Sequence, residues 1–261
     1  MVIQSSLILK HNLVYFLKDF EEIIFKLSNW NFKRISKIPE GSNYVFLVLL
    51  EPNLKKNKTD EELYAVYKPV SGEKPLMDFP IGSLHNREKL SWIISLKLGW
   101  PKLPPLVIRN GPYGIGSLQL FIEFHTQKNY FTERKSRLND FMKIAAFDVL
   151  INNSDRKAGS CLIDFNSSQI WAIDHGLTFN YFANIRTVMF EFIGQEYSDQ
   201  IIDDIGSLIF LLENDKLFFS EAAIYVNELE LKLLIERGKN MLRDGFFPSL
   251  DPYVNVPWPL V

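Results

Sequence analysis

The sequence has little cysteine, no excess of one charge and no long apolar run. Cys161 is its only cysteine, so no intramolecular disulfide can form, and the composition fits a reducing compartment such as the cytoplasm. The formal net charge of -2 offers no basic surface for nucleic acid, which is therefore not an expected partner. No uninterrupted apolar stretch reaches the length of a membrane span, and the first residues, MVIQSSLILKHNL, contain no charged leader. We expect neither secretion nor membrane insertion.

The early part of the chain is predicted to be mainly β. The short β-branched and aromatic runs YVFLVLLE (44–51) and LYAVYKP (63–69) are typical of strands, and a charged connection separates them. PPLVIRN and SLQLFIEFH indicate two further strands around the turn GPYGIG. Apolar residues three and four apart predict a helix over about 13–28 that precedes these strands.

Helices dominate the prediction for the rest of the chain. One is expected over 84–98, with Ser83 as its N-cap and Gly99 past its end. Further apolar stripes predict helices at 138–150, 201–212 and 221–243. The sequence thus predicts an α+β fold with a β-rich N-lobe (1–124) and a helical C-lobe (125–261).

The segment INNSDRKAGSCLID (151–164) places a polar loop between an apolar helix and a short strand. A hairpin is expected next, because CLIDF and QIWAID flank the turn residues NSS. Asp155 precedes this hairpin and Asp174 follows it, so pairing of the two strands would bring both carboxylates to one end. Phosphoryl transfer uses such a pair: one carboxylate orients the attacking hydroxyl and accepts its proton, and the other holds the magnesium that bridges the nucleotide phosphates.

Each of these acids also has a purely structural interpretation. An aspartate among Asn and Ser residues commonly forms an Asx-turn or caps a helix, which would account for Asp155. Asp174 precedes His175 and Gly176 after a strand, and this is ordinary turn chemistry. The pair, rather than either acid alone, favours a functional site.

Lys68 ends an apolar strand, where a cation is costly unless it reaches a polar cleft or finds a partner. Glu88, near the start of the following helix, is a candidate partner, and Glu73 and Asp78 could compete with it. The alternative is an edge-strand lysine whose ammonium group stays in water.

The segment PEGSNY provides a turn before a strand. The backbone N–H groups of Gly41, Ser42 and Asn43 could cover phosphates there, because consecutive N–H groups in a turn form a concave anion site. These three residues are therefore candidates for nucleotide binding.

The order of these features resembles the protein kinase-like fold in its phosphoinositide-kinase branch, with two lobes. The loop NNSDRKAG is similar to the catalytic loop of type II phosphatidylinositol 4-kinases, and AIDHGLTF is similar to their metal-binding segment. Together with AVYKPVSGEKPLMDFPIGSLHNRE, GWPKLPPLVIRNGPYGIGSLQLFIE, RTVMFEF and PWPLV, these motifs resemble a bacterial phosphatidylinositol 3-/4-kinase-like family. The resemblance runs from about residue 30 onward.

The resemblance implies a role for each matching residue. Lys68 would contact phosphate, Asp155 would be the catalytic-loop aspartate and Asp174 the principal metal ligand. The backbone of an interlobe hinge would contact adenine, at Ile122, Glu123 and Phe124. ATP and Mg²⁺ are the implied cofactors.

One position departs from the family's pattern. Active phosphoinositide-type kinases have an asparagine five residues after the loop aspartate, where it holds a second metal ion, and the bacterial relatives tend to have histidine. Here the position is Ser160, whose hydroxyl would be a weaker magnesium ligand. Lys157 could instead neutralise charge on the transferring phosphoryl group, or it could be a solvated loop cation.

The sequence therefore predicts an ATP- and Mg²⁺-dependent phosphotransferase with an unknown hydroxyl acceptor, which could be a protein, a small molecule or a phosphoinositide. A nucleotide-binding pseudokinase with a regulatory role and transfer of AMP to a protein are the alternatives. Arg186 is the only cation in LTFNYFANIRTVMFEF, where a phosphoinositide headgroup would call for more positive charge. The fold alone does not fix the acceptor.

Overall fold

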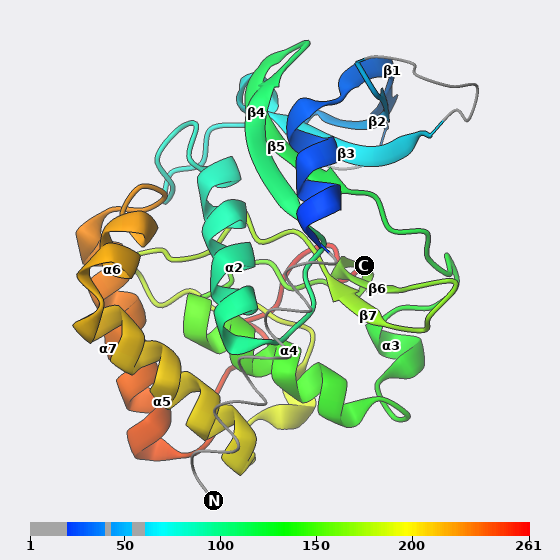
Figure 1. The fold of residues 1–261 in the computed structure, drawn as a ribbon. Coiled ribbons are helices and arrows are strands. Elements are labelled where there is room, and N and C mark those ends of the chain that lie inside the picture. Colours follow the sequence, from blue (N-terminus) through cyan, green and yellow to red (C-terminus); the bar gives the residue numbers. More distant parts are fainter. Residues whose placement is uncertain (1–19, 40–42, 54–60) are drawn as a thin grey trace, which may run out of the picture. The chain divides into compact units, whose positions relative to one another are not determined.

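The computed structural model describes residues 20–39, 43–53 and 61–261 (Figure 1). The chain divides into two units by its internal contacts. The described residues up to Lys74 form the first unit together with Pro105–Phe121, and Pro75–Pro104 form the second together with Ile122–Val261. The lobe boundary at residue 124 stays a prediction.

The first unit contains a five-stranded antiparallel sheet in the order β1-β2-β3-β5-β4. Its elements are β1 (Asn31–Ile38), β2 (Val45–Glu51), β3 (Leu63–Pro69), η1 (Val70–Gly72), β4 (Leu106–Gly111) and β5 (Gly114–Leu120). Residues 20–29 are helical, and the start of the predicted helix, 13–19, lies outside the described residues.

Alternation along the strands builds the core of this unit. Val48 and Leu50 on β2 and Ala65 and Tyr67 on β3 have no exposed surface, and Leu27 of the helix 20–29 belongs to the same cluster. A spacing of two places such residues on one face of a sheet. β1 was not predicted. It is an edge strand whose charged residues are mostly exposed, so it lacks the apolar alternation that identifies a strand.

The second unit is mainly helical. Its α-helices are α2 (Leu84–Leu98), α3 (Tyr130–Glu133), α4 (Leu138–Ile151), α5 (Asp199–Asn214), α6 (Lys216–Ala222) and α7 (Glu228–Asp244). Two 3-10 turns and a hairpin complete it: η2 (Ala158–Ser160), η3 (Phe190–Phe192), and β6 (Cys161–Ile163) paired with β7 (Ile170–Ala172). α5 and α7 pack closely, since a Cβ on Gly238 would lie 2.4 Å from the Cδ1 atom of Ile209.

The predicted bounds of α2 are confirmed, but its start is stabilised differently. Gly99 ends the helix with a left-handed φ of 78°. Ser83 occupies the N-cap position without capping through its side chain. Its hydroxyl donates to the Pro80 carbonyl over 2.7 Å and accepts from Nε of Arg87 over 3.2 Å.

The single helix predicted over 221–243 is wrong, because two helices share this stretch. α6 ends at Ala222, and α7 begins after Asn227. Asn227 and Glu230 form a capping box, in which the asparagine side chain accepts from the N–H of Glu230 over 3.0 Å. The new N-cap interrupts an apolar period that continues across the break.

The order of elements confirms the predicted α+β, kinase-like fold class. Lys68 lies on the third strand of an antiparallel sheet, and the next helix, α2, carries Glu88. The apolar helix α4 leads into the polar loop with Asp155, then into the hairpin, and finally to Asp174 before Gly176. A strand lysine, a helix glutamate, a catalytic loop and an Asp-x-Gly segment follow one another in this order in protein kinases.

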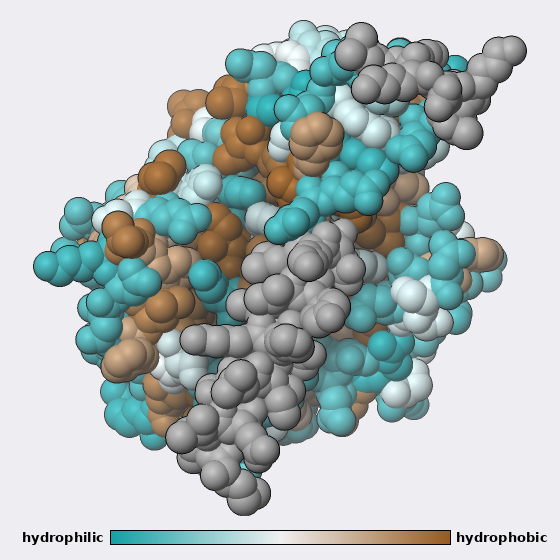
Figure 2. All heavy atoms as spheres, viewed as in Figure 1, coloured by the Kyte–Doolittle hydropathy of each residue, from teal (hydrophilic) through white to brown (hydrophobic). Residues whose placement is uncertain are grey.

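Figure 2 shows apolar side chains among hydrophilic ones, with brown atoms over α6 and α7. The exposed apolar residues of this stretch include Leu217, Ile224 and Leu229. Isolated exposed apolar side chains are common on protein surfaces and need no partner. Within the described ranges, no helix combines the length and the apolar character needed to cross a bilayer.

Candidate active site

The β6–β7 hairpin brings two loops to one end. Its strands are antiparallel, with Cys161 opposite Ala172. The loop that contains Asp155 enters the hairpin at Cys161, and the loop that contains Asp174 leaves it after Ala172. The N–H of Ile173 extends this pairing. It donates to the carbonyl of residue 160 over 3.0 Å, so the two loops run together beyond the strands.

Two asparagines shape the loop after α4. Asn152 ends this helix with a left-handed φ of 54°, and its Nδ2 donates to the carbonyls of Asn180 and Phe182 at 3.1 and 2.7 Å. The Oδ1 atom of Asn153 accepts from the N–H of Asp155 at 3.1 Å. The Asx-turn that the sequence left open for Asp155 is thus made by the side chain of Asn153.

Arg156 is a buried cation that joins three parts of the site. Its guanidinium pairs with both carboxylate oxygens of Asp148 on α4, at 2.7 and 2.9 Å. It also donates to the carbonyls of Ser160 and Ile173, each at 3.1 Å. Its Nη2 lies 2.7 Å from Nε2 of His175. Arg156 has no exposed surface, so the pairing with Asp148 has to compensate for the loss of water around the charge.

Asp155 is partly buried beside Lys157, whose Nζ lies 3.1 Å from Oδ2 of the aspartate. Burial raises the pKa of Asp155 above its ordinary value, and the charge of Asp174 adds to this rise, while Lys157 opposes it. The interaction with Asp174 means that the two carboxylates share one electrostatic environment. A carboxylate whose pKa is raised in this way is suited to accept a proton.

Asp174 lies in a strained turn, with a left-handed φ of 62°. The turn packs against the first half of α2. A Cβ on Gly176 would lie 3.4 Å from Cβ of Leu84 and 3.9 Å from Cγ of Glu88. Glu88 is 7% exposed and therefore lies buried beside the segment that carries Asp174.

A second buried arginine fixes this segment to two helices. Arg87 on α2 donates to the Thr178 carbonyl over 2.5 Å and pairs with Glu230 at the start of α7 over 2.6 Å. The hydroxyl of Thr178 donates in turn to the carbonyl of His175 over 2.8 Å. The residues that follow Asp174 are therefore held by α2 and by α7.

Ser160 and Asp174 are the predicted metal ligands. Ser160 is buried in η2, and its carbonyl accepts from both Arg156 and Ile173. In the part of the chain that the structure describes, no group of three or more His, Cys, Asp or Glu side chains could hold a metal. Magnesium at nucleotide sites needs no such group, because one or two carboxylates act together with phosphates and water. Hard oxygen donors of this kind fit magnesium.

The predicted hinge borders the hairpin. Phe124 bridges to Asp164, and the N–H of His125 donates to the carbonyl of Ile163 over 3.0 Å. The carbonyl of Glu123 accepts from the N–H of Phe165 over 2.9 Å. Ile122 is buried. The 122–124 segment is thus fixed to the same hairpin as the two acidic loops.

Two of the predicted nucleotide-binding residues are described within the first unit. Lys68 on β3 lies opposite Ser117 on β5, and the strands approach so closely that a Cβ on Gly116 would come 2.3 Å from the Lys68 carbonyl. The side chain of Asn43 accepts from the N–H of residue 74 over 2.9 Å. Gly41 and Ser42 lie outside the described residues.

No protein-family model matches the chain. Protein Rv2133c of Mycobacterium tuberculosis (strain ATCC 25618 / H37Rv) is 30% identical over 279 residues, which cover 93% of this chain and 96% of the relative. The chain belongs to the Rv2133c family. This relationship extends over nearly the whole of both proteins, and it leaves the resemblance to a phosphatidylinositol 3-/4-kinase-like family without confirmation.

Solved kinase structures are similar to this Rv2133c family member only at a low level. The Golgi casein kinase with Mn/ADP bound is 15% identical, with a TM-score of 0.49 over 87% of this chain and 75% of that chain. The Helicobacter pylori proinflammatory kinase CtkA is 11% identical, with a TM-score of 0.45 over 84% of this chain and 95% of that chain. Likenesses of this size transfer no residue roles.

Sequence reasoning missed the residues that hold the site together. Arg156 stood inside the motif NNSDRKAG and His175 inside AIDHGLTF, each directly after an acid that was predicted to act. Asp148 and Arg87 are polar residues on the buried sides of helices, and a charge at an apolar helix position is the signal that could have identified them. The spacing of residues along the sequence does not show which residues pair with Asp148 and Arg87.

Proposed function

We propose that this chain is an ATP- and Mg²⁺-dependent phosphotransferase that acts on a hydroxyl-bearing acceptor. The observation that carries the proposal is the buried contact between Arg156 and His175. These residues directly follow Asp155 and Asp174, so the contact ties together two acidic loops that leave one end of a hairpin. A pair of carboxylates held in fixed relation is what positioning catalysis of phosphoryl transfer requires.

Asp155 would orient the acceptor hydroxyl and accept its proton, which suits the raised pKa of this buried carboxyl. Lys157, 3.1 Å from that carboxylate, would offset negative charge that builds up on the transferring phosphoryl group. Asp174 and Ser160 would hold magnesium, which neutralises phosphate charge when it is bound. Glu88, buried beside the turn of Asp174, would position the phosphate-binding lysine, Lys68.

The nucleotide would be bound by the remaining predicted residues. The backbone of 122–124 would contact adenine. The Glu123 carbonyl already accepts from the N–H of Phe165, so other backbone groups of this segment would make the contact. The turn with Gly41, Ser42 and Asn43 would cover the phosphates. Only the last of these three residues is described, and its side chain organises the local backbone.

The acceptor class follows from charge. The segment 177–192 offers Arg186 as its only cation, which disfavours a phosphoinositide headgroup and favours a protein or a small hydroxylated molecule. The resemblance to the phosphoinositide-kinase branch would then describe the fold and not the substrate. The single, buried Cys161 keeps the cytoplasm as the proposed compartment.

ATP labelled separately at the α and γ positions tests the proposal. Transfer of the γ label to an acceptor, to the chain itself or to water supports a kinase-type reaction, and it should disappear in Asp155→Asn. Transfer of the α label would instead indicate movement of AMP. Nucleotide binding without transfer of either label would favour a pseudokinase, for which Ser160 in the second metal position is the supporting observation.

A further inference from the structure

Residues 246–260, which we call the strap, run antiparallel along the segment 185–196 that follows the metal-binding turn. At one end, Phe246 bridges to Glu196, and the N–H of Phe247 donates to the carbonyl of Gln195 over 2.9 Å. At the other end, the N–H of Thr187 donates to the carbonyl of Asn255 over 2.9 Å. The two segments therefore run in opposite directions, and the strap follows the segment 185–196 for most of its length.

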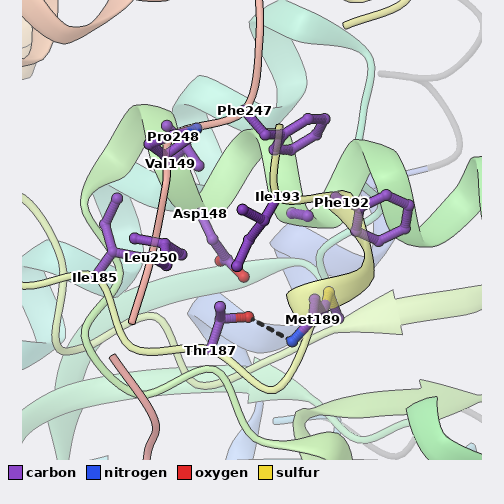
Figure 3. Close-up of a pocket in the computed structure, with 11 residues that line it drawn as sticks. Asp148, Val149, Ile185, Thr187, Met189, Phe192, Ile193, Phe247, Pro248 and Leu250 are labelled. Atoms are coloured by element: carbon purple, nitrogen blue, oxygen red, sulfur yellow. Dashed lines mark hydrogen bonds between the residues drawn. The ribbon is translucent and has the colours of Figure 1, made fainter. Parts of the chain in front are cut away.

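Apolar packing joins the strap to the segment and to α4. Phe247 stacks on Phe192 with ring centroids 5.6 Å apart. Figure 3 shows Phe247, Pro248 and Leu250 of the strap around a pocket whose other walls come from 185–193 and from Asp148 and Val149 of α4. The strap therefore also packs beside the helix whose Asp148 holds Arg156.

The opposite edge of the segment pairs with the catalytic loop. The N–H of Arg156 donates to the carbonyl of Arg186 over 3.0 Å, and the N–H of Val188 donates to the carbonyl of Arg156 over 3.2 Å. The N–H of Arg186 donates to the carbonyl of Asn153 over 3.1 Å. Residues 185–188 thus lie between the catalytic loop on one edge and the strap on the other.

The strap also reaches the catalytic loop directly. The N–H of Ala158 donates to the carbonyl of Leu260 over 2.8 Å. The next loop residue, Gly159, faces Val261, with a Cβ position 3.6 Å from its backbone carbon. The loop residues on both sides of Lys157 are therefore held, 156 through the segment and 158 through the strap.

The side chain of Asn255 joins the strap to the segment 185–196. Its Nδ2 donates to the carbonyl of Ile185 over 2.9 Å, while its Oδ1 accepts from the N–H of Asp251 over 2.9 Å. Its own carbonyl accepts from Thr187. One side chain thus closes the turn of the strap and clamps it to the segment.

We infer that Asn255 is a positioning residue for the proposed phosphotransfer site. It acts through the strap, which presses 185–188 against the catalytic loop and so keeps Asp155 in place. In many kinases the segment after the metal-binding turn is ordered only when phosphorylation supplies a partner. Here the chain itself supplies the partner. The expected effect on turnover rests on the proposed function, whereas the contacts between the strap, the segment 185–188 and the catalytic loop do not.

The test compares the wild type with Asn255→Asp and with Tyr253→Ala as a matched control. Asn255→Asp keeps the size and the Oδ1 acceptor but replaces the Nδ2 donor, so an oxygen would face the Ile185 carbonyl. Tyr253 belongs to the same turn, and its residue is 92% exposed. Amide hydrogen exchange, circular dichroism, and the kcat and KM for γ-phosphate transfer from ATP are measured for all three proteins.

We expect Asn255→Asp to speed amide exchange at 153–158 and 185–188 while leaving α5 and α7 protected. Turnover should fall on the order of tenfold at unchanged KM for ATP, because orientation rather than nucleotide binding is lost. Tyr253→Ala should behave as the wild type. Faster exchange confined to 251–256 would overturn the inference, as would an equal loss in both variants.

A measurement on the wild type keeps the inference testable if Asn255→Asp fails to fold. The Thr187 and Ala158 amides should exchange slowly in the intact protein, and rapid exchange at both would overturn the link. Should the wild type transfer no phosphate while Asn255→Asp still loosens the catalytic loop, the proposed function would fail and the strap would stand.

Discussion

Arg156 donates a hydrogen bond to His175, with 2.7 Å between Nη2 and Nε2. Because a guanidinium group can only donate, Nε2 must accept, and the proton of the neutral imidazole must lie on Nδ1. The two residues stand one position after Asp155 and Asp174. The loops that carry the two acids are thereby connected through two buried neighbours.

The stability of this link gives the first prediction. Arg156→Met should lower the free energy of unfolding by about 3–5 kcal/mol, since it leaves Asp148 charged, buried and without its cation. Adding Asp148→Leu should recover part of this loss, because no buried charge is then left. Denaturant unfolding followed by circular dichroism measures both. Equal losses in the single and double variants would mean that the unpaired charge of Asp148 is not the cause of the loss.

The mutation of the proposed base gives the second prediction. Asp155→Asn should reduce turnover by on the order of 10² or more at nearly unchanged ATP affinity, since the group would act on the acceptor in the transition state. Steady-state kinetics and nucleotide titration measure the two quantities separately. Asp140→Asn, which changes a half-buried acid at the start of α4, is the matched control. Normal turnover in a folded Asp155→Asn protein would remove the assigned role.

How far the sequence predicted the structure depended on the range of the interactions. The bounds of β3 and α2 were predicted correctly because local signals mark them: a β-branched and aromatic run in β3, and Gly99 at the end of α2. The hairpin was recognisable from its turn, where Asp164 accepts from two backbone N–H groups. β1 escaped because an exposed edge strand carries no apolar alternation, and the helix at 221–243 was split by a cap that the apolar period concealed.

The sequence predicted the two acids of the candidate site but not the contacts that hold their loops in place. Asp155 precedes the predicted hairpin and Asp174 follows it, so strand pairing alone predicted that both would lie at the same end of the hairpin. The contacts of Arg156 and of Asn255 join residues that lie far apart in sequence. No local pattern encodes such contacts, because they depend on how α4, the 185–196 segment and the strap pack together.

The pH dependence of turnover gives the third prediction. If Asp155 is the base, turnover requires its ionised form and should rise with pH through the pKa of this group, which burial places above the ordinary value. Lys157 lowers that pKa, so Lys157→Met should raise it and shift the acid limb of the kcat profile to higher pH. Lys239→Met, which removes an exposed partner of Glu213, should leave the limb in place. A limb that moves to lower pH in Lys157→Met would contradict the assignment.

The fourth prediction separates phosphate binding from adenosine binding. If Lys68 contacts phosphate, Lys68→Met should weaken ATP binding more than adenosine binding, because only the phosphate contact is lost. Isothermal titration with both ligands measures the difference. Lys74→Met, an exposed lysine of the same unit, is the control. Equal weakening of ATP and adenosine would show that the substitution disturbs β3 instead.

Metal binding gives the last prediction. A hard cation gains free energy from each well-placed oxygen and keeps water where the protein offers none, so a site made of Asp174 and the Ser160 hydroxyl should bind magnesium weakly. ATP affinity should therefore depend on magnesium concentration in the wild type, and Asp174→Ala should abolish that dependence. Ser160→Asn supplies a carboxamide oxygen and should shift the dependence to lower magnesium concentration. Ser160 is buried, so thermal unfolding must first show that this variant keeps its fold. Three coincident magnesium curves for the wild type, Ser160→Asn and Asp174→Ala would mean that the two acids are structural, and the phosphotransferase proposal would fail with them.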